Sequence, residues 1–93
     1  MSLLLKDPLA VLDYAVDWGD QYLDGDLLLE SAWSVTPAEN GGVSVLTDSF
    51  DDRTSRIKLS GGIAGRIYRV CNRVVTAGGR EDSRSLVLRV EAR

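Results

Sequence analysis

Apolar and polar side chains alternate along most of this chain, a pattern typical of strands that bury one face. Six runs show this period of two, each bounded by segments rich in Gly, Asp, Asn or Pro. The predicted strands are residues 12–18, 27–35, 43–46, 54–59, 67–75 and 84–90. Because the runs recur about every ten to fifteen residues, they predict an all-β sandwich or barrel.

The alternation also assigns residues to an inward and an outward face. In the first run, Asp13, Ala15 and Asp17 point outward, opposite the apolar set. The predicted inward residues are Leu12, Tyr14, Val16 and Trp18; Leu29, Trp33 and Val35; Ile57 and Leu59; Tyr68, Val70, Asn72 and Val74; and Leu86, Leu88 and Val90. Together they predict one core between two sheets.

The predicted fold is an immunoglobulin-like antiparallel β-sandwich of six to seven strands, formed by residues 1–93 as a single domain. Trp33 near the middle of the second long strand favours this topology, and Gly65 followed by Tyr68 resembles its tyrosine corner. Residues 19–26, 47–52 and 60–65 are predicted to be turns or polar loops. Residues 1–10 are predicted to form an N-terminal arm, in which Asp7 and Pro8 favour one helical turn through Leu12.

Charge is distributed unevenly although the net charge is only −3. Residues 1–52 carry 11 acidic and one basic side chain, whereas residues 53–93 carry 10 basic and three acidic ones. Such asymmetry is typical of an interaction surface, but acidic strands lying beside basic ones within the fold would explain it equally well.

The residue inventory argues against an enzyme. The chain has no histidine and one cysteine, Cys71, which excludes Ser-His and Cys-His pairs, thiolate clusters and an internal disulfide. The glycine run at 60–65 lacks the Gly-Lys-Ser/Thr ending of a phosphate loop. A weak calcium pattern remains open at Asp13, Asp17, Asp20, Asp24 and Asp26. We predict no catalytic, metal or cofactor-binding residues.

The arginines of the second half raise the question of nucleic-acid binding. They are Arg53, Arg56, Arg66, Arg69, Arg73, Arg80, Arg84 and Arg89. The net negative charge opposes nucleic-acid binding, and no aromatic side chain interleaves with them except Tyr68, which is predicted to be buried. Cross-strand pairing or a protein interface is the better interpretation.

A candidate protein-binding face follows if the second long, the penultimate and the last strand share a sheet. Its outer side would combine an apolar centre with a charged rim, as docking faces do. The predicted residues are Leu28, Glu30, Ala32, Ile67, Arg69, Cys71, Arg73, Val87 and Arg89. The alternative is that the arm at Leu3 to Leu5, or a loop, covers this face.

Short motifs in order along nearly the whole chain resemble one known family. They are Lys6-Asp7-Pro8, Val11-Leu12-Asp13-Tyr14, Asp17-Trp18, Ser31-Ala32-Trp33-Ser34-Val35, Leu59-Ser60-Gly61-Gly62, Ala64-Gly65, Tyr68, Asn72-Arg73, Thr76-Ala77-Gly78-Gly79-Arg80 and Ser83-Arg84-Ser85. The family is that of small phage and prophage proteins described as fibre-to-tail adaptors. Residues 38–46 depart from its pattern.

The resemblance implies a non-enzymatic sandwich in the virion tail whose partners are phage tail and tail-fibre proteins. It implies several copies around the tail, so we expect a homo-oligomer there, with a monomer open for the isolated protein, and no binding to nucleic acid or membrane. Without an apparent export signal, we expect the host cytoplasm before assembly. The alternative is an immunoglobulin-like binding module for a carbohydrate or cell-surface ligand, because a sandwich does not determine function.

Overall fold

The computed structural model describes residues 2–92. Within them the chain forms seven strands and one helix of five residues. In chain order these are β1 (Ser2–Lys6), β2 (Leu12–Asp17), α1 (Gly19–Leu23), β3 (Leu28–Thr36), β4 (Ser44–Phe50), β5 (Thr54–Ser60), β6 (Ile67–Thr76) and β7 (Glu81–Val90). Over this part of the chain, no helix has the length and apolar character needed to cross a membrane.

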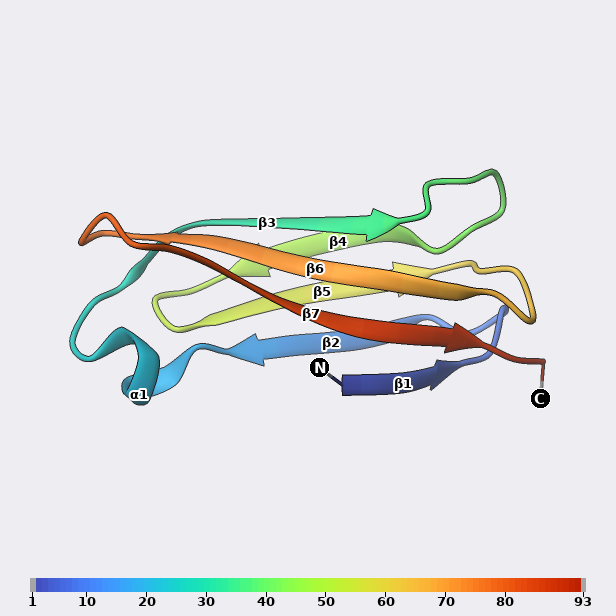
Figure 1. The fold of residues 1–93 in the computed structure, drawn as a ribbon, viewed down its shortest axis with the longest axis horizontal. Helices are drawn as coiled ribbons and strands as arrows, with labels where there is room; N and C mark the ends of the chain where they lie inside the picture. Colours follow the sequence, from blue (N-terminus) through green and yellow to red (C-terminus); the bar gives the residue numbers. More distant parts are fainter. Residues whose placement is uncertain (1, 93) are drawn as a thin grey trace.

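The strands pack as two sheets, one with the order β1-β7-β6-β3 and the other with the order β2-β5-β4. Neighbours are antiparallel except β1, which runs parallel to β7. All strands follow the long axis of a body measuring 42 × 21 × 17 Å (Figure 1). The predicted all-β sandwich is therefore confirmed. The strand order is that of an immunoglobulin constant-type domain in every strand but β1, which favours the immunoglobulin-like interpretation.

The core lies between the sheets and consists largely of the predicted inward residues. On β6, Tyr68, Val70, Asn72 and Val74 are all fully buried, and they alternate with exposed or half-buried neighbours. Buried residues from the other strands and from the positions next to them complete the core: Val16, Trp18, Leu28, Val43, Ile57, Leu59, Leu86, Leu88 and Val90, with Leu23 from α1. Alternation along β2, β5, β6 and β7 therefore predicted the buried faces correctly.

A polar network crosses this core and joins the two sheets. The indole Nε1 of Trp18 donates to Asn72 Oδ1 at 2.9 Å, and Asn72 Nδ2 donates to Ser31 Oγ at 3.0 Å. Ser31 Oγ in turn donates to Ser55 Oγ at 3.0 Å. Because Ser31 lies on β3 and Ser55 on β5, the chain of hydrogen bonds runs from one sheet to the other. Asn72 can be buried because its polar atoms have partners.

Tyr68 fixes the corner between β5 and β6. Its buried hydroxyl donates to Glu39 Oε1 at 2.7 Å and accepts the backbone N–H of Ile63 at 3.2 Å. Burial, together with the hydrogen bond to Glu39, raises the pKa of the Tyr68 phenol. A tyrosine at this corner that bonds to backbone a few residues upstream is the geometry of a tyrosine corner. The predicted packing and hydrogen-bonding role of Tyr68 is confirmed.

A β-bulge overturns the predicted face assignment at the start of β3. The register against β6 shifts between Leu28 and Glu30, so one extra residue reverses the alternation. Leu28, predicted to face outward, is only 5% exposed, whereas Leu29, predicted to face inward, is 60% exposed. Trp33 and Val35, beyond the bulge, face inward as predicted.

Two further predictions about local structure were wrong. Residues 47–50, predicted as a polar loop, belong to β4, an edge strand whose side chains are all exposed. No helical turn follows Asp7: the Ala10 N–H donates to the Asp7 carbonyl at 3.0 Å in a tight turn. Within the predicted N-terminal arm, residues 2–6 form the edge strand β1, and the short helix α1 lies within the predicted turn 19–26.

Candidate functional site

The candidate face forms because β3, β6 and β7 do share one sheet. Their register places the outward residues in rows, with Arg69 beside Val87 and Cys71 beside Ser85 and Ser34. Glu30, Ala32, Ile67, Arg69, Arg73 and Arg89 are exposed, whereas Cys71 and Val87 are half-buried. The structure thus brings together every predicted residue of this face except Leu28, which lies in the core beside Trp18 and Val74.

The N-terminal strand extends the face and does not cover it. β1 pairs with β7 so that Leu3 lies opposite Val87 and Leu5 opposite Arg89. Leu3 is 62% exposed, Leu5 46% and Ile67, on the far side of β7, 57%. We call Leu3, Leu5, Val87 and Ile67 the apolar strip. Leu3 and Leu5 were not predicted to belong to this face, because three consecutive leucines do not show which of them face outward. In the structure Leu4 packs against the core, and Leu3 and Leu5 on either side of it are exposed, as alternation along a strand requires.

Arginines share the sheet face of the apolar strip, with Arg89 between Leu5 and Ile67 and Arg69 beside Val87, and they differ in how they are paired. Arg89 Nε lies 2.8 Å from Glu91 Oε1, and Arg73 Nη2 lies 3.2 Å from Glu81 Oε1. Arg69 forms no ion pair within residues 2–92. Its guanidinium is therefore available to a carboxylate on a partner, with the planar geometry that suits such pairing.

Part of the charge asymmetry is neutralised within the molecule. Three ion pairs join an acid of the first half to a base of the second: Arg56 with Asp51 at 3.0 Å, Lys58 with Asp13 at 3.9 Å, and Arg80 with Asp26 at 3.3 Å. Most of these side chains are well exposed, so each pair contributes little to stability. The alternative of cross-strand pairing therefore applies to Lys58 and Asp13, which lie opposite each other on β5 and β2, whereas each of the other two pairs includes a residue outside the strands.

Asp26 serves the fold at the β6–β7 hairpin. Hydrogen bonds from the Thr76 hydroxyl and from the backbone N–H groups of Leu27 and Gly78, together with Arg80, lower the pKa of Asp26 to about 2. The Gly78 N–H donates to Asp26 Oδ1 at 2.9 Å. Asp26 is thus occupied by protein donors and is a poor ligand for an added cation.

The aspartates of the weak calcium pattern do not converge. Within the described residues, no three His, Cys, Asp or Glu side chains lie close enough to hold a metal ion. The side chain of Asp20 lies outside what the structure describes. Asp13 lies on β2 and pairs with Lys58 on the outer face of the β2-β5-β4 sheet, whereas Asp26 lies at the β6–β7 hairpin.

The arginines raised for nucleic-acid binding do not form one stripe. Arg69, Arg73 and Arg89 lie on the outer side of the β1-β7-β6-β3 sheet, whereas Arg56 lies on β5 in the other sheet. Arg80 lies beside the β6–β7 hairpin, and Arg84 reaches from β7 toward β2. A surface that follows a nucleic-acid backbone needs its charges on one face, whereas these arginines are spread over several faces.

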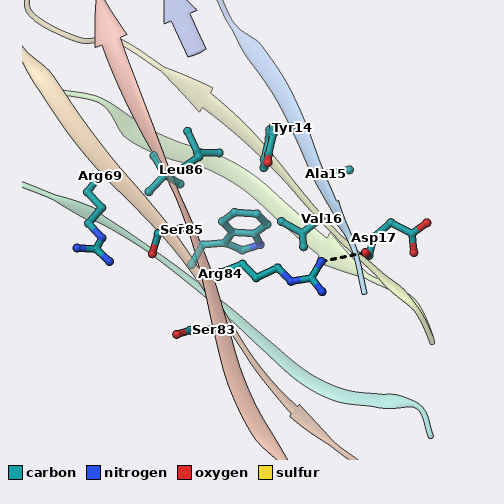
Figure 2. Close-up of a pocket in the computed structure, with 11 residues that line it drawn as sticks. Tyr14, Ala15, Val16, Asp17, Arg69, Ser83, Arg84, Ser85 and Leu86 are labelled. Carbon is teal, nitrogen blue, oxygen red and sulfur yellow. Dashed lines mark hydrogen bonds between the residues drawn. The ribbon is translucent and has the colours of Figure 1, made fainter. Parts of the chain in front are cut away.

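A cavity of about 530 Å³ opens on the side of the sandwich where β2 faces the first half of β7. Residues 14–17 and 83–86 line it, with Trp33, Arg69 and Val70. Figure 2 shows Arg84 extending across this side to Asp17, whose carbonyl accepts its Nη1 at 3.3 Å. This cavity was not predicted, because the alternation of polar and apolar residues does not show that β1 pairs with only the second half of β7.

Two tryptophans near this cavity differ in their hydrogen bonding. Trp18 is 1% exposed, bonds to Asn72, and carries the Arg84 guanidinium 4.4 Å above its ring. Trp33 lines the cavity, and its Nε1 is buried without a hydrogen-bond partner among the described residues. Neither indole is an open platform for stacking a sugar, because Trp18 is enclosed and the Trp33 ring packs edge-on against Tyr14 at 6.5 Å.

Comparison with known protein families gives one match that covers most of the chain. The family described as "Podophage GP4 fiber-tail adaptor protein gp77" matches residues 6–89. This finding confirms the resemblance drawn from the motifs of the sequence. No curated protein matches the chain significantly.

Proposed function

Because the chain belongs to the podophage GP4 fiber-tail adaptor family, we propose that it is a structural protein of the phage tail that joins tail and fibre subunits through protein contacts. Membership of an adaptor family supports a place in the virion tail and a role without catalysis. Synthesis in the host cytoplasm and assembly into the tail as several copies complete the proposal.

The observation that carries the proposal is the uncovered apolar strip. The outer sheet face exposes Leu3, Leu5 and Ile67, with Arg89 between Leu5 and Ile67, so a partner that covers this face removes apolar surface from water. The rim of Glu30, Arg69, Arg73 and Arg89 supplies charges that orient the partner. Half-buried Cys71 lies near the middle of this surface.

A substitution at the strip tests this assignment. Ile67→Asp places a charge where a partner would exclude water, so binding to the tail and fibre proteins encoded with this chain should weaken at least tenfold. Leu46→Asp is the matched control, because Leu46 is 54% exposed but lies on β4 in the other sheet. Co-purification of the proteins and calorimetry provide the readout.

The result has two informative outcomes besides the expected one. Equal binding by both variants removes the strip from the interface. A loss in the Leu46 variant alone moves the interface to the β2-β5-β4 sheet. For the oligomer, light scattering in low and high salt should show self-association that weakens with salt, because the rim contacts are screened; a monomer under all conditions contradicts a self-assembling ring.

A further inference from the structure

The first half of β7 is a free strand edge. β1 pairs only with residues 86–90 of β7, so among residues 2–92 no strand lies on the side of residues 81–85 that faces away from β6. Figure 1 shows β1 beside the second half of β7 alone. The Val90 N–H donates to the Arg66 carbonyl at 3.0 Å, so even-numbered residues of β7 direct their backbone toward β6. By alternation, Ser83 and Ser85 direct N–H and C=O groups away from the sheet.

The free edge is only locally protected. The Ser83 N–H is taken by the neighbouring side chain, Asp82 Oδ1, at 2.7 Å. The Asp82 side chain can rotate away and release this N–H. A covering strand or a proline would block the edge permanently. Ser83 and Ser85 are also small, and their side chains leave room along the edge.

The cavity of about 530 Å³ occupies the space beside this edge, in line with the N-terminal end of β1. Its inner wall includes Trp33, whose buried Nε1 has no acceptor among the described residues. A buried donor without an acceptor destabilises the free protein, and an acceptor brought by a ligand removes that cost. An incoming strand can supply one.

The charged lining favours a carboxylate on that strand. Arg69 and Arg84 are the two cationic side chains of the lining, and Arg69 forms no ion pair within residues 2–92. Asp17 is the only acid of the lining, and Figure 2 shows its carboxylate directed away from the Arg84 side, while its carbonyl accepts from Arg84. Arg69 lies on the outer face of the sheet and Arg84 on the inner face, so the lining carries one cation on each side of the edge, which suits a segment with carboxylate side chains.

We propose that the edge of β7 at residues 81–85 is a strand-addition site, which takes an extended segment of a partner protein that carries carboxylate side chains. The segment continues the line of β1, bonds to the backbone of Ser83 and Ser85, and brings an acceptor to Trp33. The inference rests on the proposed function for the choice of a protein partner, but it uses an edge and not the apolar strip.

The test uses ¹⁵N-labelled protein and a synthetic probe, the peptide acetyl-Thr-Val-Asp-Val-Asp-Val-Thr-amide. Its matched control carries lysine at both aspartate positions. We expect saturable shifts of the Trp33 indole signal and of the Ser83 and Ser85 amides, with a Kd of about 1 mM or tighter. The Trp18 indole, already bonded to Asn72, is the internal reference and should move little. The lysine peptide should bind at least tenfold more weakly.

Two variants of the protein separate backbone pairing from other modes of binding. Ser85→Pro removes an outward N–H without removing a bond to β6, so it should weaken binding at least tenfold, whereas Ser85→Ala should not. If thermal unfolding shows that the proline variant does not fold, Trp33→Phe takes its place, since it removes the indole donor and keeps an aromatic ring at this position. Unchanged binding by whichever of these variants folds overturns the proposal.

The remaining outcomes also decide the matter. No saturable shift, shifts confined to the apolar strip, or equal binding of both peptides overturns the strand-addition site. Self-association that Ser85→Pro abolishes would show that a second copy occupies the edge, which also overturns the choice of partner. The variant Ile67→Asp should bind the peptide normally, so failure of the apolar strip as an interface and failure of this site are distinguishable.

Discussion

Replacing Asn72 with leucine measures how far one buried polar network holds the two sheets together. The change preserves the branched shape of the side chain but deprives Trp18 Nε1 of its acceptor at 2.9 Å and removes the donor to Ser31 Oγ at 3.0 Å. Trp18 is 1% exposed, so water cannot replace the lost acceptor without opening the core. The orphaned Trp18 donor costs about 1–3 kcal/mol and the lost bond to Ser31 about 1 kcal/mol more, so the total is centred on about 3 kcal/mol.

Urea unfolding followed by tryptophan fluorescence is the assay. With an m value of about 1 kcal/mol/M for a small domain, the midpoint should fall by about 2–3 M. Asn40→Leu is the control, because Asn40 is exposed in a loop and the same chemical change there should alter stability by no more than about 0.5 kcal/mol.

A double-mutant cycle isolates the hydrogen bond from the other effects. Trp18→Phe removes the donor that Asn72→Leu orphans, so the double variant should be more stable than the sum of the single costs by about 1–2 kcal/mol. The hydrogen bond between Trp18 and Asn72 does not stabilise the core as argued if the losses in unfolding free energy of the two single variants simply add. The same holds if Asn72→Leu costs less than about 1 kcal/mol.

Three further predictions concern other parts of the fold. Tyr68→Phe removes both hydrogen bonds of the buried hydroxyl and should cost about 1–2 kcal/mol in urea unfolding; a smaller change than about 0.5 kcal/mol would contradict a stabilising corner. Gly62→Ala adds a methyl 2.7 Å from Val90 Cγ2 at a φ of +115° and should cost about 2–4 kcal/mol, clearly more than Gly65→Ala, where φ is also positive but the space is open. Asp26 has a folded pKa of about 2, below its ordinary value, so its stabilising effect is present above about pH 4 and is lost as pH falls toward 2. Asp26→Asn should therefore flatten the fall of the melting temperature between pH 4 and 2, and parallel curves for the two proteins would rule this out.

Alternation along the chain predicted the central strands well because their two faces meet different surroundings. Val70, Asn72 and Val74 face the core while Arg69 and Arg73 face solvent, so polarity follows geometry residue by residue. Even the polar exception, Asn72, follows the pattern, because its partners are internal.

The alternation failed where the polarity of a residue does not show which way its side chain faces. The bulge at β3 adds one residue, and nothing in the run Leu27 to Leu29 shows which leucine turns inward. β4 is an edge strand exposed on every residue, so Thr47 and Asp48 read as loop. For the candidate face, the sequence predicted the charged rim but not Leu3 and Leu5, since their place depends on a pairing between the two ends of the chain.

That pairing has a mechanical consequence. β1 and β7 run in the same direction, with Ser2 opposite Leu86 and Lys6 opposite Val90. A pull on the chain at Ser2 and Val90 in opposite directions therefore acts along the strands and loads their evenly spaced hydrogen bonds in shear, all at once, instead of peeling them one after another. The Lys6 ammonium, which is bonded to the Gly61 carbonyl at 2.6 Å, resists the same sliding. The pairing of β1 with β7 therefore resists tension that is applied between Ser2 and Val90.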